Sequence, residues 1–166
     1  MKLVGGIVML MLSWQVQALS EPVILSVYGD IRINERHYDQ MDFTLSELQA
    51  LTQSDITTAH PWSTGPQHYH GVDMNALFGL LFNNRRVLGL QLEALNDFSV
   101  TVDWSQIAPF SPILAWQEND QIMTRRNKGP LWLVLPFDRV PKVQQADFLH
   151  FMVWQLRVIR VYSEPE

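Results

Sequence analysis

The chain has 166 residues, of which 47% are hydrophobic, so it is long enough to form one domain with a full core. There are 12 lysines and arginines against 17 aspartates and glutamates, giving a net charge of −5 with no basic stripe, which argues against nucleic acid or an anionic membrane surface as a partner. The absence of cysteine excludes a disulfide framework, and it excludes a thiolate that could bind a metal or attack a substrate.

The first 18 residues have the features of a secretory signal. Lys2 supplies a positive charge, an apolar run of about a dozen residues follows, and small residues end the segment at Ala18. The run is shorter than the roughly 20 residues that span a bilayer. We therefore expect cleavage near Leu19 and a mature domain of residues 19–166, with an uncleaved membrane anchor as the alternative. Beyond this segment no apolar run is long enough to span, so stable membrane insertion is not expected.

The first half of the domain predicts strands, a helix, a loop and a second helix. Residues 22–33 alternate between apolar and polar, and Gly29-Asp30 is expected to break them into two strands. Residues 43–53 should form a helix capped by Thr44 or Ser46. The histidine-rich stretch 57–73 is expected to be largely loop, and a second helix should begin near Asp73.

The second half predicts mostly strands. Residues 89–107 indicate two strands around Asn96-Asp97, and residues 112–124 indicate a hairpin with its tip at 118–121. Residues 129–138 form a nearly continuous apolar run, typical of a buried strand. Residues 151–164 are expected to be part helix and part strand. The fold class expected is therefore α+β, with many short strands and a few helices in one domain.

Six stretches, in this order, resemble one family: "FTLSEL", a loop with Trp and Gly, "HGVDMNALF", "ALNDFSV", "RRNKGPLWLVLP" and "WQLRVIRV". The resemblance is to the molybdopterin-binding domain of the sulfite oxidase fold, in a small exported single-domain form, and it covers nearly all of the mature chain. Enzymes of this family hold molybdenum through a pterin dithiolene and one cysteine, commonly four residues before a tryptophan. Trp62 matches that tryptophan and Thr58 stands at the cysteine position. A hydroxyl does not replace a soft thiolate, so neither the molybdenum cofactor nor oxidoreductase activity is expected.

Within this fold the sequence is most similar to the PruR-like periplasmic pterin-binding proteins. The resemblance implies a non-catalytic periplasmic protein that binds a free pterin. It also implies signalling to the periplasmic sensor domain of an inner-membrane GGDEF/EAL protein, a diguanylate cyclase or phosphodiesterase of cyclic-di-GMP.

A pterin is a flat bicycle with a guanine-like edge, so it needs an aromatic face, a carboxylate for two parallel donors, and a cation near its oxygen. The candidates are Trp62 for stacking with Tyr69 or Phe98 in reserve, Asp97 for the carboxylate, Arg125, Arg126 or Lys128 for the cation, Thr58 and Ser99 for short polar contacts, and His60 as a further ligand contact. Each has a structural alternative: Trp62 as an anchor of the core, Asp97 as a hydrogen-bond acceptor for its own turn, and residues 124–130 as a solvated turn. Trp116, Trp132 and Trp154 are expected in the core.

The histidines offer a competing interpretation. His68 and His70 would point the same way on a strand, and His60 could join them to bind zinc or copper. Alternatively, His70 packs under the second helix while His68 faces solvent. Two other classes therefore stay open: a molybdopterin-dependent oxidoreductase, or a subunit of one, with an atypical site, and a periplasmic metal-binding protein based on histidines. No phosphate-binding loop or serine nucleophile motif is present.

Overall fold

The structure is a computed structural model that describes residues 20–165, and the predicted signal, residues 1–18, lies outside the described residues.

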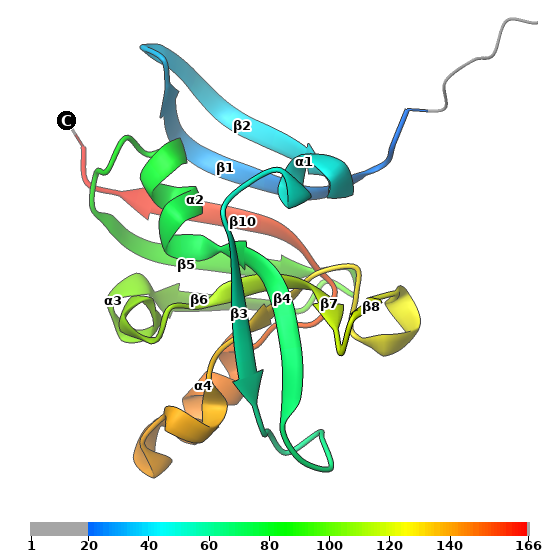
Figure 1. Cartoon of the computed structure of the whole chain (residues 1–166). Helices are drawn as coiled ribbons and strands as arrows, with labels where there is room; N and C mark the ends of the chain where they lie inside the picture. The colour runs from blue at the N-terminus through cyan, green and yellow to red at the C-terminus, as the bar shows by residue number, and fades with distance from the viewer. Residues whose placement is uncertain (1–19, 166) are drawn as a thin grey trace, which may run out of the picture.

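The first of two sheets pairs the beginning of the domain with its end. The strand order is β2-β1-β10-β5-β6, with β1 and β10 parallel and the other neighbours antiparallel. Figure 1 shows β10, in red, between β1 and β5. The strands are β1 (Val23–Ile33), β2 (Arg36–Thr44), β5 (Val87–Ala94), β6 (Ser99–Asp103) and β10 (Leu156–Ser163).

The second sheet is antiparallel and carries the stretch that holds three of the five histidines. Its order is β3-β4-β7-β8, and β9 also pairs with β7, on the same edge as β8 and opposite β4. The β3–β4 hairpin projects below the first sheet in the view of Figure 1. The strands are β3 (Gln53–Thr58), β4 (Gln67–Asp73), β7 (Ile113–Glu118), β8 (Gln121–Ile122) and β9 (Trp132–Val134).

The helices are short, and their starts follow local sequence signals. Thr44 and Glu47 form a capping box at α1, and the Asp73 side chain accepts from the backbone N–H of Ala76 at α2. Within residues 20–165 no helix is both long and apolar enough to cross a membrane. The α-helices are α1 (Leu45–Gln49), α2 (Met74–Leu81), α3 (Trp104–Ile107) and α4 (Gln145–Phe151), and the 3-10 turns are η1 (Ala108–Phe110), η2 (Arg125–Asn127), η3 (Phe137–Arg139) and η4 (Lys142–Gln144).

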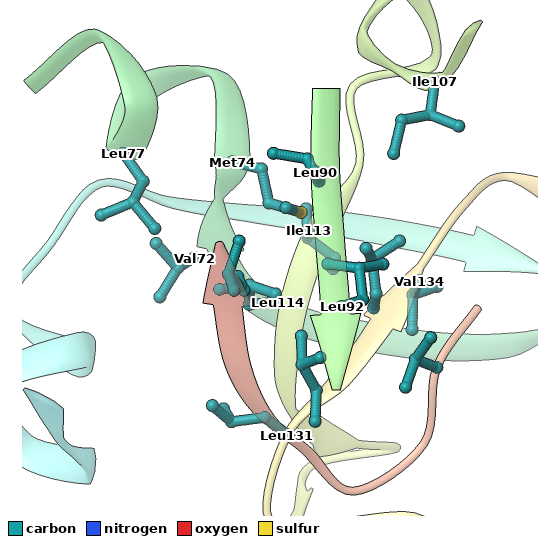
Figure 2. Packing of buried hydrophobic residues seen from close by; sticks show 14 of the residues in the cluster. Val72, Met74, Leu77, Leu90, Leu92, Ile107, Ile113, Leu114, Leu131 and Val134 are labelled. Carbon is teal, nitrogen blue, oxygen red and sulfur yellow. The ribbon is translucent and has the colours of Figure 1, made fainter. Parts of the chain in front are cut away.

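The core lies where the inner faces of the two sheets meet. Leu90 and Leu92 of β5 converge with Ile113 and Leu114 of β7, and all four are fully buried (Figure 2). Met74, at the start of α2, closes the same cluster from one side. With no disulfide in the chain, burial of this apolar surface provides the main stabilisation.

Several boundaries predicted from the sequence are wrong. The predicted helix 43–53 is only α1, and the predicted strand 129–138 is only β9. β1 does not break at Gly29-Asp30, because a bulge between Tyr28 and Ile31 accommodates Gly29 at φ +153° and the strand continues. The turn into β2 comes instead at 34–35, where both residues have positive φ. Residues 57–73 are not largely loop either, since β4 pairs with β3 and with β7, and the irregular part is confined to residues 59–66.

Candidate functional site

Three tryptophans from distant segments form one aromatic cluster. Trp62 lies in the β3–β4 loop, Trp132 on β9 and Trp154 just after α4. The Trp62 and Trp154 centroids are 5.1 Å apart and Trp132 lies 6.2 and 6.3 Å from them, all in edge-to-face geometry. Trp132 is fully buried and its indole N–H donates to the carbonyl of Met152, whereas Trp62 and Trp154 are each 40% exposed. The cluster therefore has a rigid buried base and two accessible rings.

A hydrogen-bonded chain lies behind these rings. The backbone N–H of Trp62 donates to Nδ1 of His60 at 3.2 Å, so the proton of the neutral imidazole sits on Nε2. Nε2 then donates to the Tyr69 hydroxyl at 2.7 Å, and that hydroxyl donates to Oε1 of Glu118 at 2.8 Å. Burial lowers the pKa of His60, and the nearby Lys128 lowers it further. Burial and the bond to Glu118 raise the pKa of Tyr69 above its usual range, so both rings are uncharged at neutral pH.

Lys128 links this chain to the tryptophans. Its ammonium lies 3.8 Å from Oε1 of Glu118 and 5.0 and 5.7 Å from the ring centroids of Trp132 and Trp154. Lys128 adopts a left-handed φ of 72° at the end of η2, immediately before the cis Gly129–Pro130 bond. The Lys128 side chain is mostly buried, with 18% exposure, and in such a position cation–π attraction is stronger than at an open surface.

The accessible rings border a hollow of about 200 Å³. This is smaller than the roughly 300–1,000 Å³ of pockets for drug-sized ligands, which suits a single small ring system. Phe98 contributes a third partly exposed ring, at 43%. The lining residues are Trp62, Ala94, Asn96, Phe98, Leu149, His150, Met152, Val153 and Trp154.

The structure brings some of the predicted site residues together and separates others. Trp62 and Phe98 line the hollow, and His60, Tyr69 and Lys128 lie behind its wall. Tyr69, predicted as a reserve stacking ring, is instead fully buried within the hydrogen-bonded chain.

Asp97, predicted as the carboxylate of the site, does not line the hollow. It sits at φ 64° at the β5–β6 turn with its side chain 84% exposed, and Oδ1 accepts from Arg157 at 2.8 Å. Its neighbour Asn96 lines the hollow instead. Ser99 is exposed, and its hydroxyl accepts a hydrogen bond from the side-chain amide of Gln91 at 3.3 Å.

The three basic side chains of residues 125–128 lie in different surroundings. Of its three cations, Lys128 lies against the tryptophans, Arg125 lines a second hollow on a different face, and Arg126 is exposed and lines neither. The sequence alone does not separate these residues, because the η2 turn places three neighbouring cations in three different surroundings.

The surroundings of Thr58 do not fit a molybdenum ligand. Thr58 is fully buried, its hydroxyl donates to Asp138 at 3.0 Å, and it also accepts from the Asp138 backbone N–H at 3.2 Å. The hydroxyl is thus engaged on both sides, and it is a hard ligand where molybdenum takes a soft thiolate.

The histidine pair lies on a separate surface. His68 and His70 point to the same side of β4 and both approach Asp55 of β3, at 3.3 and 2.8 Å. His70 also packs edge-on against Trp116. Among the described residues no group of three or more His, Asp or Glu side chains is placed to hold a metal ion, and His60 lies in the buried chain rather than with this pair.

Glu118, Asn96 and Trp154 were not predicted as site residues. Glu118 falls at a hairpin tip in sequence, and nothing there indicates that it accepts from a tyrosine 49 residues away. Trp154 was expected in the core, and only its half-exposed ring in the structure places it at the hollow. A sequence signal for Asn96 did exist, because it precedes Asp97 in the same predicted turn, where adjacent side chains point in different directions.

The two sheets and their connections have the α+β fold of the sulfite oxidase-type molybdopterin-binding domain, as the sequence predicted. The solved structure of the sulfane dehydrogenase SoxCD from Paracoccus pantotrophus is similar, with a TM-score of 0.57 and 15% sequence identity, over 84% of this chain and 38% of that chain. The likeness concerns the fold alone, and the chain spans well under half the length of that protein. No family model matches the sequence, and no curated protein matches it.

Proposed function

We propose that this protein binds a free pterin in the hollow between Trp62, Phe98 and Trp154. The observation that carries the proposal is the convergence of three partly exposed aromatic rings, from separate segments, on one small hollow. Stacking of a flat ring on an aromatic side chain contributes about 1–3 kcal/mol. The edge-to-face contact of Trp62 and Trp154 holds these two rings in place before a ligand arrives, which reduces the ordering cost of binding.

Polar recognition in this proposal falls to Asn96 and His150, which line the hollow. An amide offers both donors and an acceptor, which suits the mixed edge of a pterin. The side-chain oxygen Oδ1 of Asn96 already accepts from the backbone N–H of Phe98 at 3.2 Å, so the orientation of the amide is fixed. Lys128, beneath Trp154, adds a positive charge that favours an electron-rich ring and its carbonyl oxygen.

In this proposal the protein is not an enzyme and does not take up the molybdenum cofactor. Support comes from the absence of cysteine and from the engaged hydroxyl of Thr58. The proposal places the protein in the periplasm, on the basis of the predicted signal, and its partner in the periplasmic sensor domain of an inner-membrane GGDEF/EAL protein, on the basis of the sequence resemblance. Signalling would require that the partner bind the loaded form better than the empty form.

The test is a fluorescence and calorimetric titration of the mature chain with neopterin and its reduced forms, together with elemental analysis for molybdenum, zinc and copper. We expect saturable binding without stoichiometric metal. Trp62→Ala and Trp154→Ala should each weaken binding by about tenfold, the effect of one lost stacking contact. Asp97→Ala is the matched control for Asn96→Ala, because only Asn96 lines the hollow.

Unchanged affinity in both tryptophan variants would show that the pterin does not bind in this hollow. Equal loss in Asp97→Ala and Asn96→Ala would return the exposed carboxylate to the site. No pterin binding, with zinc or copper retained and lost in His68→Ala, would replace the proposal with metal binding at the histidine pair.

A further inference from the structure

A second hollow lies on the outer face of the first sheet, away from the aromatic cluster. Its volume is about 420 Å³, within the range of small-molecule sites. Ser26 and Tyr28 of β1 face it next to Val158 and Arg160 of β10, with which they are in register. Glu93 of β5 faces it as well, whereas its neighbour Ala94 lines the first hollow. The two hollows therefore lie on opposite sides of β5.

Three arginines line this second hollow, in a chain whose net charge is −5. Arg157 is paired with Glu93 at 2.5 Å and with Asp97 at 2.8 Å. Arg125 and Arg160 have no ion-pair partner among residues 20–165. The guanidinium of Arg160 lies 4.4 Å from the ring centroid of Tyr28, which orients it without neutralising it. The hollow thus has two arginines without an ion-pair partner among the described residues, beside an Arg157 that is shared by two carboxylates.

Arg157 also has unused hydrogen-bonding capacity. Its Nε is buried and has no hydrogen-bond partner within the described part of the chain. Buried donors without partners are uncommon and call for an explanation. Both hydrogen bonds of this guanidinium, to Glu93 and to Asp97, are made through Nη2.

We propose that this second hollow binds a phosphate monoester. Arg125 and Arg160, which have no ion-pair partner in the part of the chain that the structure describes, are available to a phosphate, since guanidinium groups bind phosphate oxygens through paired, charge-assisted hydrogen bonds. The apolar part of the wall, with Ile24, Leu95 and Pro130, accommodates a hydrophobic body attached to the phosphate. A phosphate monoester offers three acceptor oxygens to these guanidinium groups, whereas a carboxylate offers two. This site does not depend on pterin binding, since it shares no lining residue with the first hollow.

The test uses NMR titration of the full mature chain, following the arginine Nε–Hε signals. The probes are inorganic phosphate, phenyl phosphate, and benzoate as a monoanion with the same ring. We expect saturable shifts with phenyl phosphate at a Kd of about 1 mM or tighter, and weaker binding of benzoate. Arg125→Gln and Arg160→Gln should each weaken phenyl phosphate binding by about tenfold. Arg160→Lys should fall between wild type and Arg160→Gln, because it keeps the charge and loses the fork.

Arg126→Gln is the matched control, since Arg126 neighbours Arg125 and does not line the hollow. It should leave binding within about twofold of wild type, the level of an exposed charge. Thermal unfolding of each variant checks that the fold is intact. No saturable binding of any phosphate probe, or equal losses in Arg126→Gln and Arg125→Gln, would overturn the proposal.

Vesicles distinguish the source of the phosphate. Capture of the wild-type chain by phosphatidic-acid vesicles and not by phosphatidylcholine vesicles, with loss in Arg160→Gln, would identify a lipid headgroup as the ligand. Saturable binding of phenyl phosphate without vesicle capture would identify a soluble monoester. Vesicle capture that Arg160→Gln leaves unchanged, with soluble probes silent, would refute a site in this hollow.

Discussion

Removal of one buried hydroxyl, in Tyr69→Phe, tests the hydrogen-bonded chain behind the aromatic cluster. The Tyr69 side chain is fully buried, and its oxygen both accepts from His60 and donates to Glu118. Phenylalanine keeps the ring and its contact with Trp132, 5.0 Å away, so the aromatic packing is preserved. The variant therefore isolates the two hydrogen bonds.

The expected cost follows from the two partners that are left behind. His60 Nε2–H becomes a buried donor without an acceptor, which costs about 1–3 kcal/mol. Glu118 loses a hydrogen bond to a charged acceptor, which contributes about 1.5–3 kcal/mol, although Lys128 remains 3.8 Å away and offsets part of this. We expect the free energy of unfolding to fall by about 2–4 kcal/mol, and the melting temperature by at least about 4 °C.

Urea unfolding at pH 7.5, followed by tryptophan fluorescence and circular dichroism, measures this free energy. Tyr162→Phe is the control, because that ring is 53% exposed and its hydroxyl makes one long contact of 3.5 Å with Gln91. It should change stability by less than about 0.5 kcal/mol. A loss below about 0.5 kcal/mol in Tyr69→Phe as well would refute the chain as a stabilising element.

Three further outcomes are expected. Because burial lowers the pKa of His60 in the fold, the unfolded chain takes up the proton first, and stability should decrease as the pH falls below about 6.5, by up to about 1.4 kcal/mol per pH unit, until the folded pKa is reached. His60→Gln should reduce the pH dependence of the unfolding free energy, measured by urea unfolding at pH 5 to 8, by the contribution of one proton. An unchanged pH dependence would contradict the lowered pKa of His60. A Cβ at Gly71 would overlap the carbonyl oxygen of Leu114 on β7, so Gly71→Ala should destabilise by more than about 3 kcal/mol or prevent folding. Gly79→Ala, within α2, meets only the flexible end of Asn84 and should be neutral or stabilise by up to about 1 kcal/mol in the same assay.

Much of the fold could be predicted because its signals are local. Asp73 caps α2 and Thr44 caps α1 through side chains within three residues of the bonds that they make. The β5–β6 turn at Asn96-Asp97 and the hairpin after Glu118 were likewise read from turn residues. The continuity of β1 and the extent of β4 were missed, because pairing with β10 and β7 decides both, and those partners lie far away in sequence.

The candidate site was less accessible to sequence reasoning. Residue types were informative: Trp62 and Phe98 do border a hollow, and Lys128 does approach it. The directions of the side chains could not be predicted. Asp97 bonds to Arg157, 60 residues away, and Asn96 lines the hollow. The partner of Asp97 is far away in sequence, so the local turn signal does not reveal the ion pair.

The central place of β10 governs the order in which the molecule can be completed. Until Leu156–Ser163 are available, the first sheet exists as two separate fragments, β2–β1 and β5–β6, each with an open edge. Joining β1 to β10 closes the longest loop in the domain, which makes the step slow and places it last. We expect a chain truncated before Leu156 to expose the edges of β1 and β5 that β10 covers, and such open edges favour aggregation. For a protein with a predicted export signal, the same delay would keep the chain in the extended state that a translocation channel accepts.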